Sequence, residues 1–266
     1  MSGGLQTWLA RMLWATAAAW LFAGMTFAAA YQVYSYPSGS ETLYLKWGDN
    51  HAGTDGGTVY WSFIPAGTSG DASYCGSACP GTSVDAINLE IAPGSFTATP
   101  IAALESHITA MMARWAAHTG IRFVKLASDS GVAINDPAAV PPATGQIRIG
   151  VFAFSGGGEA AVGYAPPPNG GTGAGDILFD ANAYYQFAPG NENDPFDTSS
   201  APNDFDSLVL HELGHAIGLA HTPDDGTCPV MCVEAQCLGH IKRRLTPDDM
   251  VGAAFLYDRL FVDGFE

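Results

Sequence analysis

Three histidines and one glutamate lie within eleven residues of one another, in the segment HELGHAIGLAH at 211–221. On a helix, residues four apart share a face, so the imidazoles of His211 and His215 would point toward one place. Gly218 would let the helix end and the chain turn back, which brings in His221 as a third nitrogen ligand. Three neutral imidazoles and one open position are typical of a catalytic zinc site, whereas a structural site is closed by four protein ligands.

The glutamate of this segment, Glu212, is placed to act on a water molecule without ligating the metal. Zinc would lower the pKa of a bound water toward neutrality and polarise a carbonyl group. Glu212 would take the proton from that water as it attacks and would then deliver it to the leaving amine. The alternatives are a structural metal site or a chance arrangement of histidines. Five fixed positions in eleven residues argue against both.

The motif H-E-x-x-H-x-x-G-x-x-H, followed by a methionine, resembles the metzincin clan of zinc endopeptidases. Met231 matches the methionine that forms a turn beneath the metal in that clan, where an apolar, polarizable floor is sufficient. Two further segments are similar to the matrixins within the clan. They are the closing helix L-x-x-D-D-x-x-G-x-x-x-L-Y at 245–257, and the strand sequences AVGYAP (161–166) and GDILFD (175–180).

The resemblance implies a zincin/metzincin-like α+β fold. Its core would be a twisted, mixed five-stranded sheet with about three helices, and a substrate cleft would lie between the edge strand and the zinc helix. It also implies that an extended protein or peptide substrate pairs with the edge strand at Gly163, Tyr164 and Ala165, as in β-augmentation.

Several positions depart from the family pattern. Two histidines of the second, structural zinc of matrixins would fall at Val162 and Leu178, so we expect one catalytic zinc only. Asp180 matches a calcium ligand, but Ala183 replaces its acidic partner, which leaves calcium binding open. Val233 stands where other metzincins add a tyrosine to the zinc site. A different metzincin subfamily, with the same chemistry and another cleft, is therefore an alternative.

The pattern of elements predicts a single α+β domain over 43–260. An apolar stripe predicts a helix that begins at Thr99-Pro100 and ends at Gly120. Asn203 or Asp204 would cap the zinc helix, and Thr246 with Asp249 would form a capping box for the last helix. A Gly/Ser/Pro-rich insertion is expected at about 66–98, and Lys242-Arg243-Arg244 is expected to be a solvated run. The predicted strands are 43–50, 58–67, 121–126, 147–154 (central), 161–168 (edge) and 176–180.

Residues 1–30 are predicted to be a secretory signal peptide, because an apolar run follows Arg11 and ends in alanines. A retained membrane anchor is the alternative, since this run is almost long enough to span a bilayer. The segment 31–42 would then precede the catalytic domain, and 261–266 would form a tail. A matrixin propeptide, whose cysteine blocks the zinc, would not fit into 31–42. Cys75-Gly76 resembles that blocking pair but follows the first strands.

Charge and cysteine content indicate where such a protein works. Without residues 1–30, nine basic and 26 acidic residues give a net charge of −17, which argues against nucleic acid or an anionic membrane as partner. All five cysteines would meet an oxidising compartment, so we expect one disulfide between Cys75 and Cys79 and one among Cys228, Cys232 and Cys237. The alternative is that a thiolate of the second group ligates the zinc as a latency device.

These observations predict a secreted, monomeric zinc endopeptidase, either extracellular or periplasmic. The alternative from another class is a secreted metal-binding or adhesive module that kept the fold and lost turnover. The presence of Glu212 argues against that module.

Overall fold

The computed structural model describes residues 31–73, 79–155 and 158–257. The predicted signal peptide (1–30), the predicted tail (261–266) and Cys75-Gly76 lie outside the described residues. The segment 31–42 is described, and it contains β1, β2 and the start of β3.

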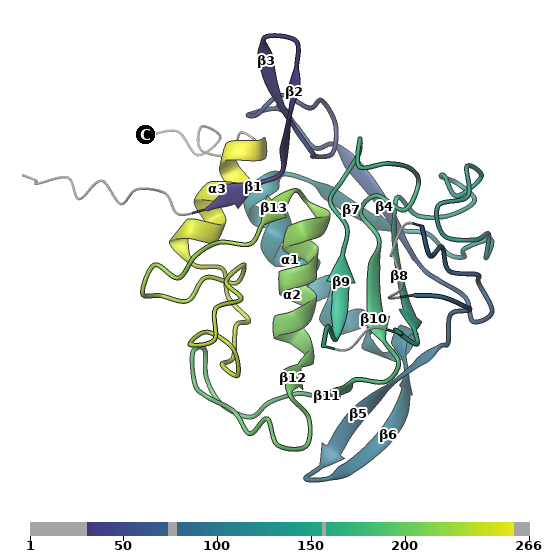
Figure 1. Ribbon diagram of the computed structural model, residues 1–266, viewed down its shortest axis with the longest axis vertical. Helices are drawn as coiled ribbons and strands as arrows, with labels where there is room; N and C mark the ends of the chain where they lie inside the picture. Colours follow the sequence, from purple (N-terminus) through teal and green to yellow (C-terminus); the bar gives the residue numbers. More distant parts are fainter. Residues whose placement is uncertain (1–30, 74–78, 156–157, 258–266) are drawn as a thin grey trace, which may run out of the picture.

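A twisted five-stranded sheet lies at the centre of the molecule, in the order β7-β4-β8-β10-β9 (Figure 1). β9 runs antiparallel to β10 and the other pairings are parallel, so the sheet is mixed as expected. All residues of β8 are buried, which agrees with its predicted central place, and β9 is the edge strand. The strands are β4 (Thr58–Phe63), β7 (Arg122–Lys125), β8 (Ile147–Phe152), β9 (Ala161–Gly163) and β10 (Ile177–Asp180).

Three α-helices pack together beside this sheet, and α1 contacts both α2 and α3 (Figure 1). The buried indole of Trp115 on α1 donates from Nε1 to the carbonyl oxygen of Leu210 on α2, at 2.9 Å. Among the described residues, no helix has the length and apolar character needed to cross a membrane. The helices are α1 (Glu105–Thr119), which follows the 3-10 turn η1 (Ile101–Leu104), α2 (Phe205–Ala216) and α3 (Pro247–Tyr257).

The remaining strands form three smaller sheets. β5 and β6 make a hairpin that continues through β11 to β12, and β12 leads directly into α2. β1 pairs with β13, which follows α2, and β2 pairs with β3 in a hairpin that projects at the top of Figure 1. Their bounds are β1 (Gln32–Val33), β2 (Ser35–Ser38), β3 (Glu41–Tyr44), β5 (Ala86–Ala92), β6 (Ser95–Pro100), β11 (Tyr184–Gln186), β12 (Asn203–Asp204) and β13 (Leu219–Ala220).

Two local expectations from the sequence are wrong. Thr99 and Pro100 do not start the helix, because they pair with β5 as the end of β6, and α1 begins only after η1. The predicted insertion at about 66–98 includes β5 and most of β6, and whether it is an insertion stays a prediction. The expected strand at 43–50 ends at Tyr44. Beyond it the chain folds around the buried Lys46, whose Nζ donates to backbone carbonyls including that of Asp49 at 2.7 Å.

The predicted helix ends are confirmed where a side chain or a glycine sets them. Gly120 closes α1 in the left-handed conformation, with φ +68°. Asp204 caps α2 by accepting from the N–H of Ser207 at 3.1 Å. At α3, the Thr246 N–H donates to the carboxylate of Asp249 at 2.8 Å, and the Asp249 N–H donates to Thr246 Oγ1 at 3.4 Å.

Apolar side chains pack on both faces of the sheet. Alternate residues of a strand face opposite sides, so one strand can contribute to both faces. Ile177 and Phe179 of β10 belong to the main core with the helices. Leu178, between them, belongs to a second apolar cluster that includes Phe152 and Ile64. Strand β10 therefore contributes to two cores at once.

We predict that Leu178→Ala destabilises the protein by about 2–5 kcal/mol, since it leaves a cavity in the second cluster. Leu178 is 0 % exposed, whereas Leu238 is 60 % exposed, so Leu238→Ala serves as the control and should change stability by less than about 0.5 kcal/mol. Urea unfolding measures both variants. Equal losses would show that the second cluster is not a packed core.

Candidate metal centre

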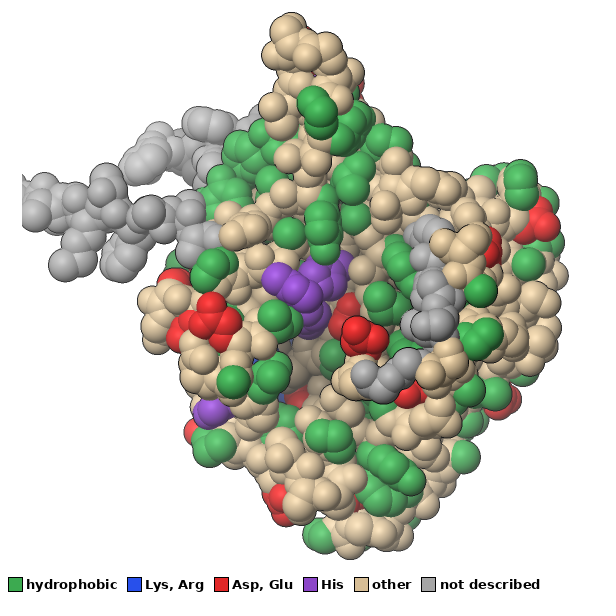
Figure 2. Space-filling model, viewed as in Figure 1, with side chains coloured by type: hydrophobic (Ala, Val, Ile, Leu, Met, Phe, Trp, Pro, Cys, Tyr) green, Lys and Arg blue, Asp and Glu red, His purple; other side chains and the backbone are tan. Residues whose placement is uncertain are grey.

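The three histidines of the motif converge at one point. Their nearest ring nitrogens all lie within 4.8 Å of one another, and Nε2 of His215 is 3.0 Å from Nε2 of His221. Tetrahedral zinc with Zn–N distances of about 2.0–2.1 Å separates its nitrogen ligands by about 3.3 Å, so one ion fits this donor set with little movement. Figure 2 shows the histidine side chains together at the centre of one face, beside a hollow in the surface.

Gly218 makes the turn that returns His221 to the helix. It adopts φ +107°, and a Cβ at this position would lie 2.3 Å from the carbonyl oxygen of Leu45. A side chain is therefore excluded both by the backbone conformation and by space. The chain then enters β13, which ends immediately before His221.

Two backbone carbonyls determine which nitrogen each helical histidine presents. Nδ1 of His211 lies 2.7 Å from the carbonyl oxygen of Val230, and Nδ1 of His215 lies 2.8 Å from that of Leu219. Since a carbonyl can only accept, each Nδ1 carries the proton and each Nε2 keeps a free lone pair. Such second contacts fix the tautomer and orientation of histidine ligands.

Burial keeps the rings in the form that binds a metal. It lowers the pKa of His211, His215 and His221, because removal from water penalises the charged imidazolium. For His215 the pKa falls to about 3, with a further contribution from the neighbouring His211. All three rings are therefore neutral near pH 7 and can donate lone pairs.

Glu212 is buried between α2 and the edge strand. Its carboxylate accepts the Gly163 N–H, and burial raises the pKa of this carboxyl to about 8. A Cβ on Gly163 would lie 2.4 Å from the Glu212 carbonyl oxygen and 3.0 Å from Oε2. β9 can approach the helix this closely only because residue 163 is a glycine.

Tyr164 and Ala165 are the other two residues predicted to bind substrate. The Tyr164 N–H donates to the Asp176 carbonyl at 2.9 Å. Ala165 is buried and follows the end of β9.

Met231 lies directly against the zinc helix. A Cβ on Gly214 would be 2.2 Å from the Met231 sulfur, so the glycine between His211 and His215 makes room for the methionine. The turn that carries it is held by Asp249 of α3, which accepts the N–H groups of Val230 at 3.0 Å and Met231 at 3.3 Å. The sequence identifies Asp249 only as a capping residue, whereas the structure joins it through Val230 to His211.

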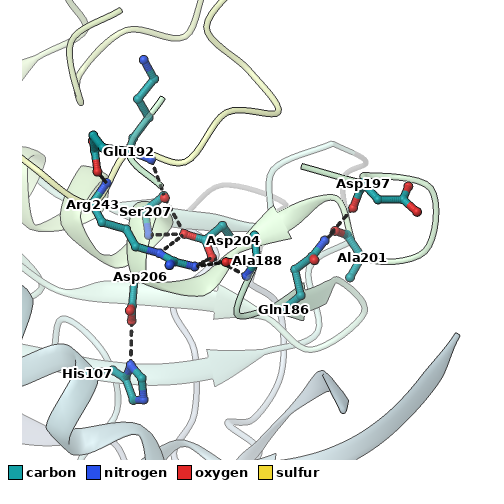
Figure 3. A network of polar contacts seen from close by, with 11 residues as sticks. His107, Gln186, Ala188, Glu192, Asp197, Ala201, Asp204, Asp206, Ser207 and Arg243 are labelled. Atoms are coloured by element: carbon teal, nitrogen blue, oxygen red, sulfur yellow. Dashed lines mark hydrogen bonds and ion pairs between the residues drawn. The ribbon is translucent and has the colours of Figure 1, made fainter. Parts of the chain in front are cut away.

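A polar network fixes the start of α2 (Figure 3). The Asp204 carboxylate caps the helix and also accepts from Arg243, whose side chain donates to the Ala188 carbonyl at 2.8 Å. Ser207 Oγ donates to Asp204 and accepts the Lys242 N–H at 2.8 Å. The expectation of a solvated basic run is wrong for Lys242 and Arg243. Lys242 is buried and donates from Nζ to the Cys228 carbonyl, and Arg243 is half-buried with its guanidinium on Asp204.

The histidines open into a cleft of about 450 Å³. β9 and Glu159 form one side, and the segment that follows Met231 forms the other side with Val233, Leu238 and Lys242. Cys237 of this second wall forms a disulfide with Cys228, which precedes Met231, and this confirms one bond within 228–237.

Cys232 is a free, buried thiol, and burial raises its pKa, which keeps the thiol protonated. None of these three cysteines joins the histidine cluster, so the structure does not support a zinc-bound thiolate from this segment. The predicted Cys75–Cys79 bond involves a residue outside the described ranges.

Val162 and Leu178 are direct partners in the pairing of β9 with β10, and both contribute to the second apolar cluster. Apolar packing thus occupies the place where the family pattern has two zinc ligands. Asp180 Oδ1 accepts the N–H groups of Phe154 at 2.9 Å and Asn182 at 3.0 Å, which anchors the chain beyond β8 and β10. In the described part of the chain, Asp180 belongs to no group of three or more candidate metal ligands.

A family model described as Matrixin, of the peptidase M10 type, matches residues 85–258, which is more than half of the chain. The chain belongs to the matrixin family. A comparison with curated proteins finds no match. Membership in the matrixins supports a zinc metallopeptidase, and the mixed five-stranded sheet with three helices fits the α+β fold of these enzymes.

We predict that Asp204→Ala destabilises this matrixin by at least about 3 kcal/mol. The variant removes the cap of α2, worth about 0.5–2 kcal/mol, and leaves the half-buried Arg243 guanidinium without its carboxylate. The control is Asp225→Ala, because Asp225 accepts a nearby backbone N–H but is exposed. Guanidinium chloride unfolding compares the two. A loss in Asp204→Ala no larger than in the control would show that the network does not stabilise α2.

Proposed function

We propose that this matrixin is a secreted zinc-dependent endopeptidase, in which His211, His215 and His221 hold one zinc ion and Glu212 is the general base. The observation that carries the proposal is the arrangement of α2. Two neutral histidines with free Nε2 lone pairs point at the same place as a third, and an unligated carboxylate lies beside them in the cleft. When bound, zinc supplies Lewis-acid chemistry, which lowers the pKa of a water molecule and polarises a peptide carbonyl.

Glu212 is suited to take a proton from water and to return it to a leaving amine. Its raised pKa, about 8, lies close to neutral pH, where a group that must first accept and then donate is most effective. A cation held by the adjacent histidines would lower this pKa again and favour the carboxylate before reaction. The Gly163 N–H fixes the orientation of the carboxylate.

A substrate would lie extended along β9, the open edge of the sheet and one wall of the cleft. The Gly163 N–H is directed at Glu212 and the Tyr164 N–H at the carbonyl of Asp176, directly before β10, so neither is free to pair with a peptide. The proposed pairing therefore uses carbonyl groups of β9 as acceptors for substrate N–H groups. Met231 would act as the apolar floor beneath the metal.

The alternative of a metal-binding module without turnover is less well supported. A buried carboxyl is costly, and such a module would have no use for one beside its histidines. In this chain Glu212 is buried, lines the cleft and is held by the edge strand. The proposal of secretion rests on the predicted signal peptide and on a disulfide in the cleft wall.

We predict that Glu212→Gln lowers kcat on a casein substrate about 10²–10⁴-fold while zinc binding and fold remain. Glutamine keeps the volume of the side chain and an oxygen that can accept the Gly163 N–H, so only proton transfer is lost. As a matched control, His215→Ala should lose zinc together with activity. Near-normal proteolysis by a zinc-loaded Glu212→Gln enzyme would refute the role assigned to this residue.

We also predict one tightly bound zinc per chain, because Val162 and Leu178 are apolar where the family has a second pair of ligands. Elemental analysis of the purified protein measures this ratio, and a chelator should abolish proteolysis until zinc is returned. Two zinc ions per chain would mean that other residues form a second site.

A further inference from the structure

Strand β1 lies beside the metal centre, because it pairs with the strand that leads to His221. β1 pairs antiparallel with β13, with Gln32 opposite Ala220 and Val33 opposite Leu219, directly before His221 (Figure 1). The Tyr34 N–H then donates to the carbonyl oxygen of Gly218 at 3.0 Å. Residue 34 is therefore held beside the turn that connects the second and third histidines of the motif.

The side chain of Tyr34 continues into the site. Its hydroxyl lies 3.3 Å from Nδ1 of His215, its ring centroid is 6.0 Å from that of His215, and it lines the cleft with Glu212 and β9. The same Nδ1 is 2.8 Å from the Leu219 carbonyl oxygen. Since this nitrogen carries the proton, Tyr34 and Leu219 share it in a three-centre hydrogen bond. Nδ1 of His211, in contrast, contacts one acceptor among the described residues, the Val230 carbonyl.

A mere packing role for Tyr34 does not explain where its polar atom lies. The side chain is half-buried at the edge of the cleft, so the hydroxyl could have faced water without cost. Instead it faces a ring nitrogen of a residue that the proposed function makes a metal ligand. Groups that hold the second nitrogen of a histidine ligand set the ring orientation and the basicity of the first.

We infer that Tyr34, the residue that follows β1, is a positioning residue for His215; this inference rests on the zinc site of the proposed function. The phenol holds the His215 ring by its Nδ1–H and keeps Nε2 aimed at the point shared with His221. Position 233, two residues after Met231, is a valine, so it supplies no tyrosine to the site. The structure brings a tyrosine from the opposite end of the chain, and its contact is with a histidine.

The test compares Tyr34→Phe with Tyr36→Phe. Tyr36 lies two residues further along, in β2, and is not among the residues that line the cleft. Zinc affinity is measured by competition with a chromophoric chelator, and cobalt replaces zinc so that the visible spectrum reports the geometry of the ligands. Tyr34→Phe should weaken zinc binding about 10–100-fold and alter the cobalt spectrum. Tyr36→Phe should match the wild type, and thermal unfolding of the metal-free proteins should be similar.

A third variant, Tyr34→Leu, separates the hydroxyl from the ring. It should weaken zinc binding at least as much as Tyr34→Phe does. Wild-type zinc affinity in Tyr34→Phe would overturn this inference and leave the proposed metal site standing. The same conclusion would hold if Tyr34→Leu bound zinc weakly, because the ring and not the hydroxyl would then matter. A wild-type protein that binds no zinc would overturn this inference together with the proposed metal site. Proteolysis that fails with zinc bound normally would affect only the proposed function.

Discussion

Two imidazole N–H groups, each donating to a backbone carbonyl, are the interactions on which the metal centre depends. Without the bonds to Val230 and Leu219, the rings of His211 and His215 could turn, and no single point would receive their Nε2 lone pairs. Each carbonyl must itself be held in place. Asp249 of α3 holds the turn at Val230, and the pairing of β1 with β13 holds Leu219. The end of the domain and its beginning therefore both support one turn of α2.

A second constraint is the close packing around α2. Gly163 lets the edge strand approach Glu212, Gly214 lets Met231 pack against the helix, and Gly218 passes the carbonyl of Leu45. In each case a Cβ would lie 2.2 to 2.4 Å from another atom. This packing removes Glu212 and His215 from water, which raises the pKa of Glu212 and lowers that of His215. The pKa shifts of these two residues thus follow from the close packing around α2.

The remainder of the sheet is held by apolar packing and by a buried ion pair. Leu178 and its partner Val162 pack with Phe152 and Ile64, so hydrophobic burial stabilises this face of the sheet. On the same sheet, the fully buried pair of Arg148 and Asp129 joins β8 to a loop. The first arrangement packs β9 and β10 with β8, and the second fixes β8 to its neighbouring loop. β9 is the strand that a substrate would meet.

The sequence alone determined the features that depend on local spacing. The interval between His211 and His215 places them on one helical face, and Asp204 and Thr246 mark helix starts. The apolar run 147–154 identifies the central strand. Each of these patterns acts within a few residues of the chain. The tertiary structure decided which distant groups complete the site. Carbonyl acceptors are chemically alike along the whole chain, so no motif singles out those of Val230 and Leu219. The place of Tyr34, 181 residues before His215, was decided by strand pairing, as was the loss of the expected cap at Thr99.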